Sequence, residues 1–144
     1  MFTHPRPAPF GRPHQLANTY ARVGVETNVN VASPHKLIAL LFDGLADSLV
    51  IARSAMAAGQ IEAKCAAIQR AARIIEEGLK AGLNLESGLK LADDLHALYS
   101  YSVLRLTYAN LHNDQNAILE VQKLMQPLRE AWHEIGPQVE GARN

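Results

Sequence analysis

Residues 89–111 carry two rows of residues at helical spacing, and each row is mostly apolar. The first row is Leu91, Leu95, Leu98, Ser102, Leu106 and Ala109. The second row is Ala97, Tyr101, Leu104, Tyr108 and Leu111. At about 100° per residue the two rows lie roughly 100–120° apart on one helix. A helix needs only one such row to reach a core, so the second must be buried by another helix of the bundle or by something that the chain binds.

Three further segments have the apolar pattern of amphipathic helices. The four predicted helices cover about residues 34–58, 61–81, 89–111 and 115–135. Ser33 is a good N-cap for the first helix, and Pro34 suits its first turn, where a missing N–H costs nothing. Gly59 predicts the end of this helix, and Gly136 with Pro137 predicts the end of the last. Four helices about 30 Å long with short connections predict an all-α, antiparallel four-helix bundle with a flexible N-terminal arm.

Composition divides the chain into three parts. Residues 1–17 contain four of the seven prolines, which fix φ and lack a donor, so we expect a flexible Pro-rich tail. Residues 18–32 alternate partly like a strand, but the chain offers no second strand, so we expect an arm or short helix laid on the domain. The bundle with its arm is therefore predicted at 18–136, followed by a frayed C-terminus at 137–144.

Composition and charge exclude several classes of function. A formal net charge of +0 gives no field that favours nucleic acid. The longest strongly apolar run, residues 37–42, is far shorter than the ~20 residues of a membrane span, so no membrane insertion is expected. The N-terminus lacks the apolar stretch of a signal peptide, which predicts a cytoplasmic protein. The single cysteine, Cys65, excludes an internal disulfide and a thiolate zinc cage.

Candidate catalytic chemistry is weak. Helix bundles hold di-metal sites with paired Glu-x-x-His motifs, and this chain offers Asp93-x-x-His96 and Glu130-x-x-His133. The apolar positions beside them turn all four side chains outward, so we expect no metal site. Cys65 has no activating histidine on its own face, and no nucleotide-binding glycine pattern is present. We therefore expect neither a cofactor nor an enzymatic activity.

Several short segments follow one another in a specific order over residues 17–136. They include Tyr-Ala-Arg-Val at 20–23, Ala-Ser-Pro-His-Lys-Leu-Ile at 32–38, Leu-Phe-Asp-Gly at 41–44, and the segments at 72–83, 95–101 and 129–135. Together they resemble the flagellin-specific export chaperones, the FliS family. The chain departs from the family pattern at Gly88–Leu89, where a second glycine is common, and at Ser100, where the family commonly has aspartate.

The resemblance implies a non-enzymatic function. Members of the family bind the C-terminal segment of newly made flagellin, block its premature polymerisation and deliver it to the flagellar type III export apparatus. Recognition would place an amphipathic segment in apolar grooves of a preformed bundle. The resemblance also implies that the tyrosine of the arm covers a groove in the free protein or contacts a component of the export gate.

The second row of residues 89–111 and the broad apolar face of the first helix are the surfaces that can supply such grooves. We expect the partner-binding residues to be Tyr20 and Val23 from the arm, with Ile74, Leu79, Tyr101, Leu104 and Tyr108 from the bundle. The alternatives are an adaptor for another secretion substrate, a self-associating adaptor such as a homodimer, and a metal enzyme. Binding to flagellin, light scattering and metal analysis distinguish them.

Overall fold

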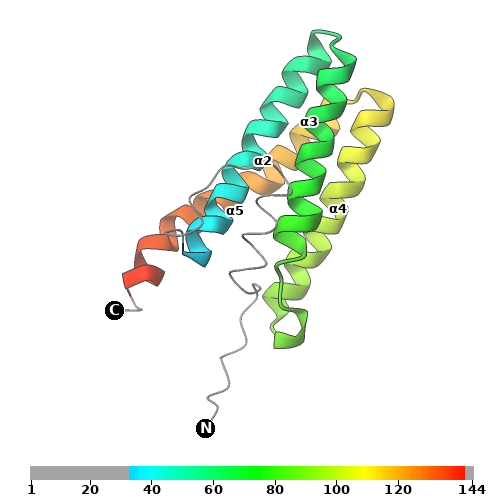
Figure 1. Cartoon of the computed structure of the whole chain (residues 1–144). Helices are drawn as coiled ribbons and strands as arrows, with labels where there is room; N and C mark the ends of the chain where they lie inside the picture. Colours follow the sequence, from blue (N-terminus) through cyan, green and yellow to red (C-terminus); the bar gives the residue numbers. More distant parts are fainter. Residues whose placement is uncertain (1–32, 142–144) are drawn as a thin grey trace.

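The computed structural model describes residues 33–141, and its regular elements are all helices (Figure 1). They are α2 (Pro34–Ala57), α3 (Ile61–Arg73), the π-helical segment η1 (Ile74–Lys80), the short 3-10 helix η2 (Leu85–Ser87), α4 (Lys90–His112) and α5 (Gln115–Gly141). α2 packs against α3 and α5, and α4 packs against the same two helices and η1. α2 and α4 therefore stand at opposite corners, and the predicted four-helix bundle is confirmed. The predicted tail at 1–17 and arm at 18–32 lie outside the described residues.

Both ends of α2 form as the sequence predicts. The Ser33 side chain accepts a hydrogen bond from the backbone N–H of Lys36 at 3.1 Å, which satisfies one of the free donors of the first turn. At the other end Gly59 has a φ of 71°, and the N–H of Gln60 reaches back to the carbonyl of Ala55 at 2.9 Å. This is the Schellman arrangement, which requires a left-handed residue and therefore favours glycine.

The second predicted helix is only partly α-helical. After Arg73 the chain continues as η1, and the N–H of Ala81 still bonds five residues back to the carbonyl of Glu76 at 3.2 Å. Buried residues run along this helix and the turn after it in two rows at spacing four: Ala71, Ile75, Leu79 and Leu83 in one row, Ile74, Gly78 and Gly82 in the other. In an α-helix a residue four positions on is rotated by about 40° from the first. The wider π turn offsets that drift, so both rows stay inside the bundle.

The last helix is longer than predicted. α5 continues through Gly136 and Pro137 to Gly141, so the expected stop after Ile135 is wrong. A proline inside a helix removes one donor, but it does not prevent the residues that follow it from remaining helical. Figure 1 shows α5 leaving α4 at the turn that joins them and ending beside the start of α2. There the Trp132 indole N–H donates to the His35 carbonyl at 2.8 Å, and the two rings stack.

The broad apolar face of α2 is used by the bundle itself. Its buried apolar residues are Leu37, Ile38, Ala39, Leu41, Phe42, Leu45, Leu49, Ala52 and Ala55. They form one cluster with the buried residues of the other helices. The expectation that this face supplies a partner groove is therefore wrong, and α4 is left as the candidate surface.

A polar cluster around Asp43 joins α2 to α5. One oxygen of this carboxylate accepts from Arg129 Nε at 2.8 Å and contacts His133 Nε2 at 2.9 Å. Partial burial by itself raises the pKa of Asp43, but the hydrogen bonds from Arg129 and His133 outweigh it, and the pKa lies below the ordinary value of 3.8.

We expect this cluster to make the fold less stable in acid. The pKa of Asp43 is lower in the folded than in the unfolded chain, so its contribution is complete above the unfolded value and is lost as the pH falls through the folded value. The urea concentration at the unfolding midpoint should decrease as the pH is lowered from about 5 to about 3. Asp43→Asn should lower the midpoint at neutral pH and make this acid decline shallower. An unchanged pH profile in the variant would contradict the assignment.

Candidate partner-binding face

The second row of the sequence analysis lies on the outside of α4, and we call it the outer row: Ala97, Tyr101, Leu104, Tyr108 and Leu111. All five residues are exposed, with Leu104 at 69% and Leu111 at 76%. Tyr101 and Tyr108 each expose 43% of their surface. The bundle therefore does not bury this row, and the requirement for a partner stands.

The first row faces the core, with one exception. Ser102, Leu106 and Ala109 are fully buried. Leu91, however, is 57% exposed, and Ala92 is the buried residue of that turn. Leu91 was therefore placed wrongly, because α4 begins only at Lys90 and its first turn lies at the edge of the bundle.

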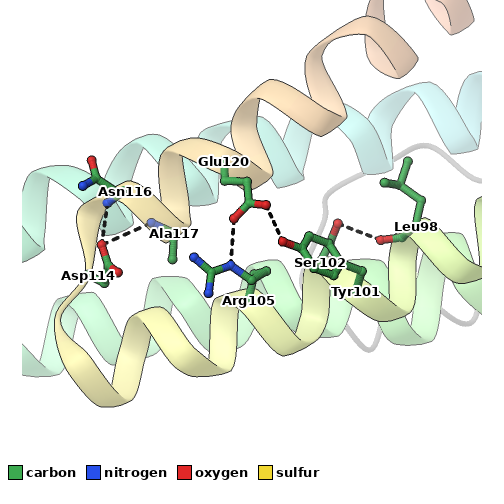
Figure 2. Close-up of polar contacts among 8 residues, drawn as sticks. All are labelled: Leu98, Tyr101, Ser102, Arg105, Asp114, Asn116, Ala117 and Glu120. Carbon is green, nitrogen blue, oxygen red and sulfur yellow. Dashed lines mark hydrogen bonds and ion pairs between the residues drawn. The ribbon is translucent and has the colours of Figure 1, made fainter.

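The C-terminal end of α4 is fixed by polar contacts. Lys64 of α3 is buried, and its ammonium group donates to the Asn110 carbonyl at 3.0 Å and to Asn113 Oδ1 at 2.6 Å. The positive charge of Lys64 at the C-terminus of α4 also interacts favourably with the dipole of that helix. Asn113 then takes a left-handed conformation, and Asp114 caps α5 by accepting from the N–H groups of Asn116 and Ala117 (Figure 2). The break predicted at residues 112–114 is confirmed.

One carboxylate connects the outer row to α5. Glu120 accepts a hydrogen bond from the Tyr101 hydroxyl with one oxygen and from Arg105 Nε, at 2.7 Å, with the other (Figure 2). Hydrogen bonds from Tyr101 and Arg105 lower the pKa of Glu120. The bond between Tyr101 and Glu120 also raises the pKa of Tyr101. Glu120 is thus ionised and Tyr101 is neutral across the physiological range.

The contacts continue along α4 toward its C-terminus. The Arg105 guanidinium carbon lies 4.9 Å from the centre of the Tyr108 ring, within range of a cation–π interaction. The Tyr108 and His112 rings are tilted against each other, with centres 4.3 Å apart. Both tyrosines of the outer row are therefore held on the side of α4 that faces Glu120, and Leu104 lies exposed between them in sequence.

The predicted partner-binding residues do not all reach this face. Tyr101, Leu104 and Tyr108 share it, as expected. Ile74 and Leu79 lie in the core, with 0% and 4% exposure, so they are not on the surface of the described bundle. Their burial follows from the π-helical geometry of η1, which turns both rows of that helix inward. Tyr20 and Val23 lie outside the described residues.

Two residues near the face were not distinguished by sequence reasoning. Glu120 has no role in the sequence analysis, because its pairing with Tyr101 depends on how α4 and α5 are aligned. Tyr99 resembles Tyr101 in sequence but is 2% exposed, and burial raises the pKa of its phenol. The first is part of the candidate site and the second belongs to the core.

Other kinds of site find little support in the described part of the chain. It contains no group of three or more histidine, cysteine, aspartate or glutamate side chains able to hold a metal ion. A depression of about 200 Å³ lies between α2 and α5, lined partly by Phe42, Val50 and Met125, and is smaller than the ~300–1,000 Å³ of small-molecule sites. None of the described helices is long and apolar enough to cross a membrane.

The chain is similar to flagellar proteins over most of its length. The family model described as flagellar protein FliS matches residues 16–139. The flagellar secretion chaperone FliS of Salmonella typhimurium is 48% identical over 118 residues, which cover 82% of this chain and 87% of that protein. The FliS of Escherichia coli is 44% identical over 115 residues, covering 80% and 85%, and FliSB of Pseudomonas aeruginosa is 40% identical over 116 residues, covering 81% and 91%. This chain therefore belongs to the FliS family.

Proposed function

We propose that this protein is a cytoplasmic export chaperone for flagellin, which it binds through the outer row of α4. It holds the C-terminal segment of flagellin, prevents premature polymerisation and presents the complex to a component of the flagellar export gate. It acts by binding alone and catalyses no reaction. The observation that carries the proposal is the exposed outer row, which a folded monomer has no reason to leave uncovered.

The chemistry of the outer row suits an amphipathic segment. From Ala97 to Leu111 the row extends about 20 Å along α4 at 1.5 Å per residue. Its spacing of 4, 3, 4 and 3 matches the ridge of one helix face, against which a second helix or an extended apolar strand can pack. The tyrosines combine apolar rings with polar ends, as is common where partners bind.

The proposal also accounts for the rigidity of α4. Flagellin segments that are disordered before assembly must be ordered on binding, at a cost of about 2–5 kcal/mol. A surface that is already fixed adds little to that cost. The contacts of Lys64 at the end of α4 and of Glu120 along its side provide such a surface.

We expect the full-length protein to bind a peptide of the last ~50 residues of its cognate flagellin in a 1:1 complex. Isothermal titration calorimetry should show a negative heat-capacity change, because apolar surface is buried. Light scattering of the free protein and of the complex gives the stoichiometry. No binding to this peptide, together with binding to another secretion substrate or self-association, would replace the proposal with an adaptor function.

A further inference from the structure

The outer row has a supporting contact that neither the family relationship nor the proposed function assigns. Tyr101, Arg105, Tyr108 and His112 follow one another at spacings of 4, 3 and 4 along one side of α4. The first two bond to Glu120, and the last two are linked to Arg105 through ring contacts. A single carboxylate on α5 is thus the first member of a chain of contacts that includes both aromatic rings of the outer row. Figure 2 shows its first part, from Glu120 to Tyr101 and Arg105.

We propose that Glu120 is a positioning residue that holds Tyr101 directly, and Tyr108 through Arg105, in the orientation in which the outer row receives its partner. This inference rests on the proposed function for the identity of the partner. Glu120 itself need not touch the partner.

The geometry shows what a substitution of Glu120 must remove. Glu120 accepts with both oxygens, one bond coming from a hydroxyl and the other from a guanidinium. Glutamine could keep both contacts, because its oxygen can accept from Arg105 while its NH₂ group donates to the Tyr101 hydroxyl oxygen. Leucine has no polar atom and can make neither contact. Loss of the Arg105 contact also releases the cation from the face of the Tyr108 ring.

If the Arg105–Glu120 ion pair served only the fold, its loss would lower stability and leave the affinity for the partner unchanged. Arg105 and Glu120 expose 28% and 37% of their side chains, and ion pairs this open contribute little to folding. Their effect on binding can be larger, because a face that is correctly arranged only part of the time binds with proportionally reduced affinity. The test therefore compares binding and ring motion with stability.

The test uses the full-length protein with Glu120→Leu. NMR relaxation of labelled tyrosine rings in the free protein should show faster motion of Tyr101 and Tyr108, with Tyr99 unchanged. Affinity for the flagellin C-terminal peptide should fall about tenfold, while the thermal midpoint moves by less than about 2 °C. Tyr101→Phe removes the same contact from the other side, so the losses of affinity in the two variants should not add.

Asp43→Leu is the matched control. Asp43 is a carboxylate of similar exposure, 35% against 37%, that also interacts with two groups across a helix pair. It lies on the α2–α5 edge, and its substitution should change neither ring motion on α4 nor affinity.

Two results would overturn the inference: rings that move equally in the wild type and in Glu120→Leu, or looser rings with unchanged affinity. If the wild-type protein does not bind the peptide, the proposed function fails. Ring motion in the free protein then still decides whether Glu120 positions the two tyrosines.

Discussion

We expect Leu104→Asp to weaken binding of the flagellin C-terminal segment by at least about 100-fold. The side chain is 69% exposed in the free protein and lies between Tyr101 and Tyr108 in the outer row. A partner that covers it gains about 2 kcal/mol from the leucine, and it must desolvate a carboxylate in the variant. A factor of 100 corresponds to about 2.7 kcal/mol. Calorimetric titration of the peptide measures the effect.

The same substitution should leave the fold intact. An exposed position contributes little packing, so the free energy of unfolding should change by less than about 1 kcal/mol. Val50→Asp is the control, since Val50 is 59% exposed on α2, at the opposite corner of the bundle. That variant should bind normally. Equal losses of affinity in both variants, or unfolding of Leu104→Asp, would show that the outer row is not the binding surface.

Leu106→Ala should have the opposite effect, lowering the free energy of unfolding by about 3 kcal/mol. Leu106 is only two residues from Leu104, yet it is fully buried in the core. Truncation there removes apolar contact and leaves a cavity that rigid neighbours fill only partly. Urea unfolding measures the loss, which is a large fraction of the ~5–15 kcal/mol by which domains are stable.

The molecules of Leu106→Ala that remain folded should bind the peptide with nearly normal affinity, because the outer row is unchanged. Leu111→Ala, at a residue 76% exposed, is the control for stability and should cost less than about 0.5 kcal/mol. A cost below about 1 kcal/mol for Leu106→Ala would mean that the two rows of α4 are assigned to the wrong sides.

Local signals in the sequence were sufficient for most of the fold. Ser33 and Gly59 act through their own side-chain or backbone chemistry, and the structure shows their caps where they were predicted. The two rows of α4 could be separated because period alone places Leu104 and Leu106 on different faces. The sequence left open whether another helix of the bundle or a partner buries the outer row, and the structure shows the row exposed.

Features that depend on how helices meet could not be read in this way. Ile74 and Leu79 are apolar residues of an amphipathic pattern, and nothing in that pattern distinguishes an α-helix from a π-helix. Glu120 is one polar residue among several on α5 until its alignment with Tyr101 is known. The sequence thus placed Tyr101, Leu104 and Tyr108 on one face, and it did not show the contact of that face with Glu120.

The π-helical segment has a consequence for chain length. A π turn holds one residue more than an α-helical turn. Removing one residue from η1 would therefore let the segment close as a regular α-helix, and the residues after the deletion would keep their orientation toward the core. A residue lost from the α-helical part, Ile61–Arg73, would instead turn every later residue of the helix by about 100°. Among related chains, the loss of a single residue should therefore be tolerated between residues 74 and 80 and be rare between 61 and 73.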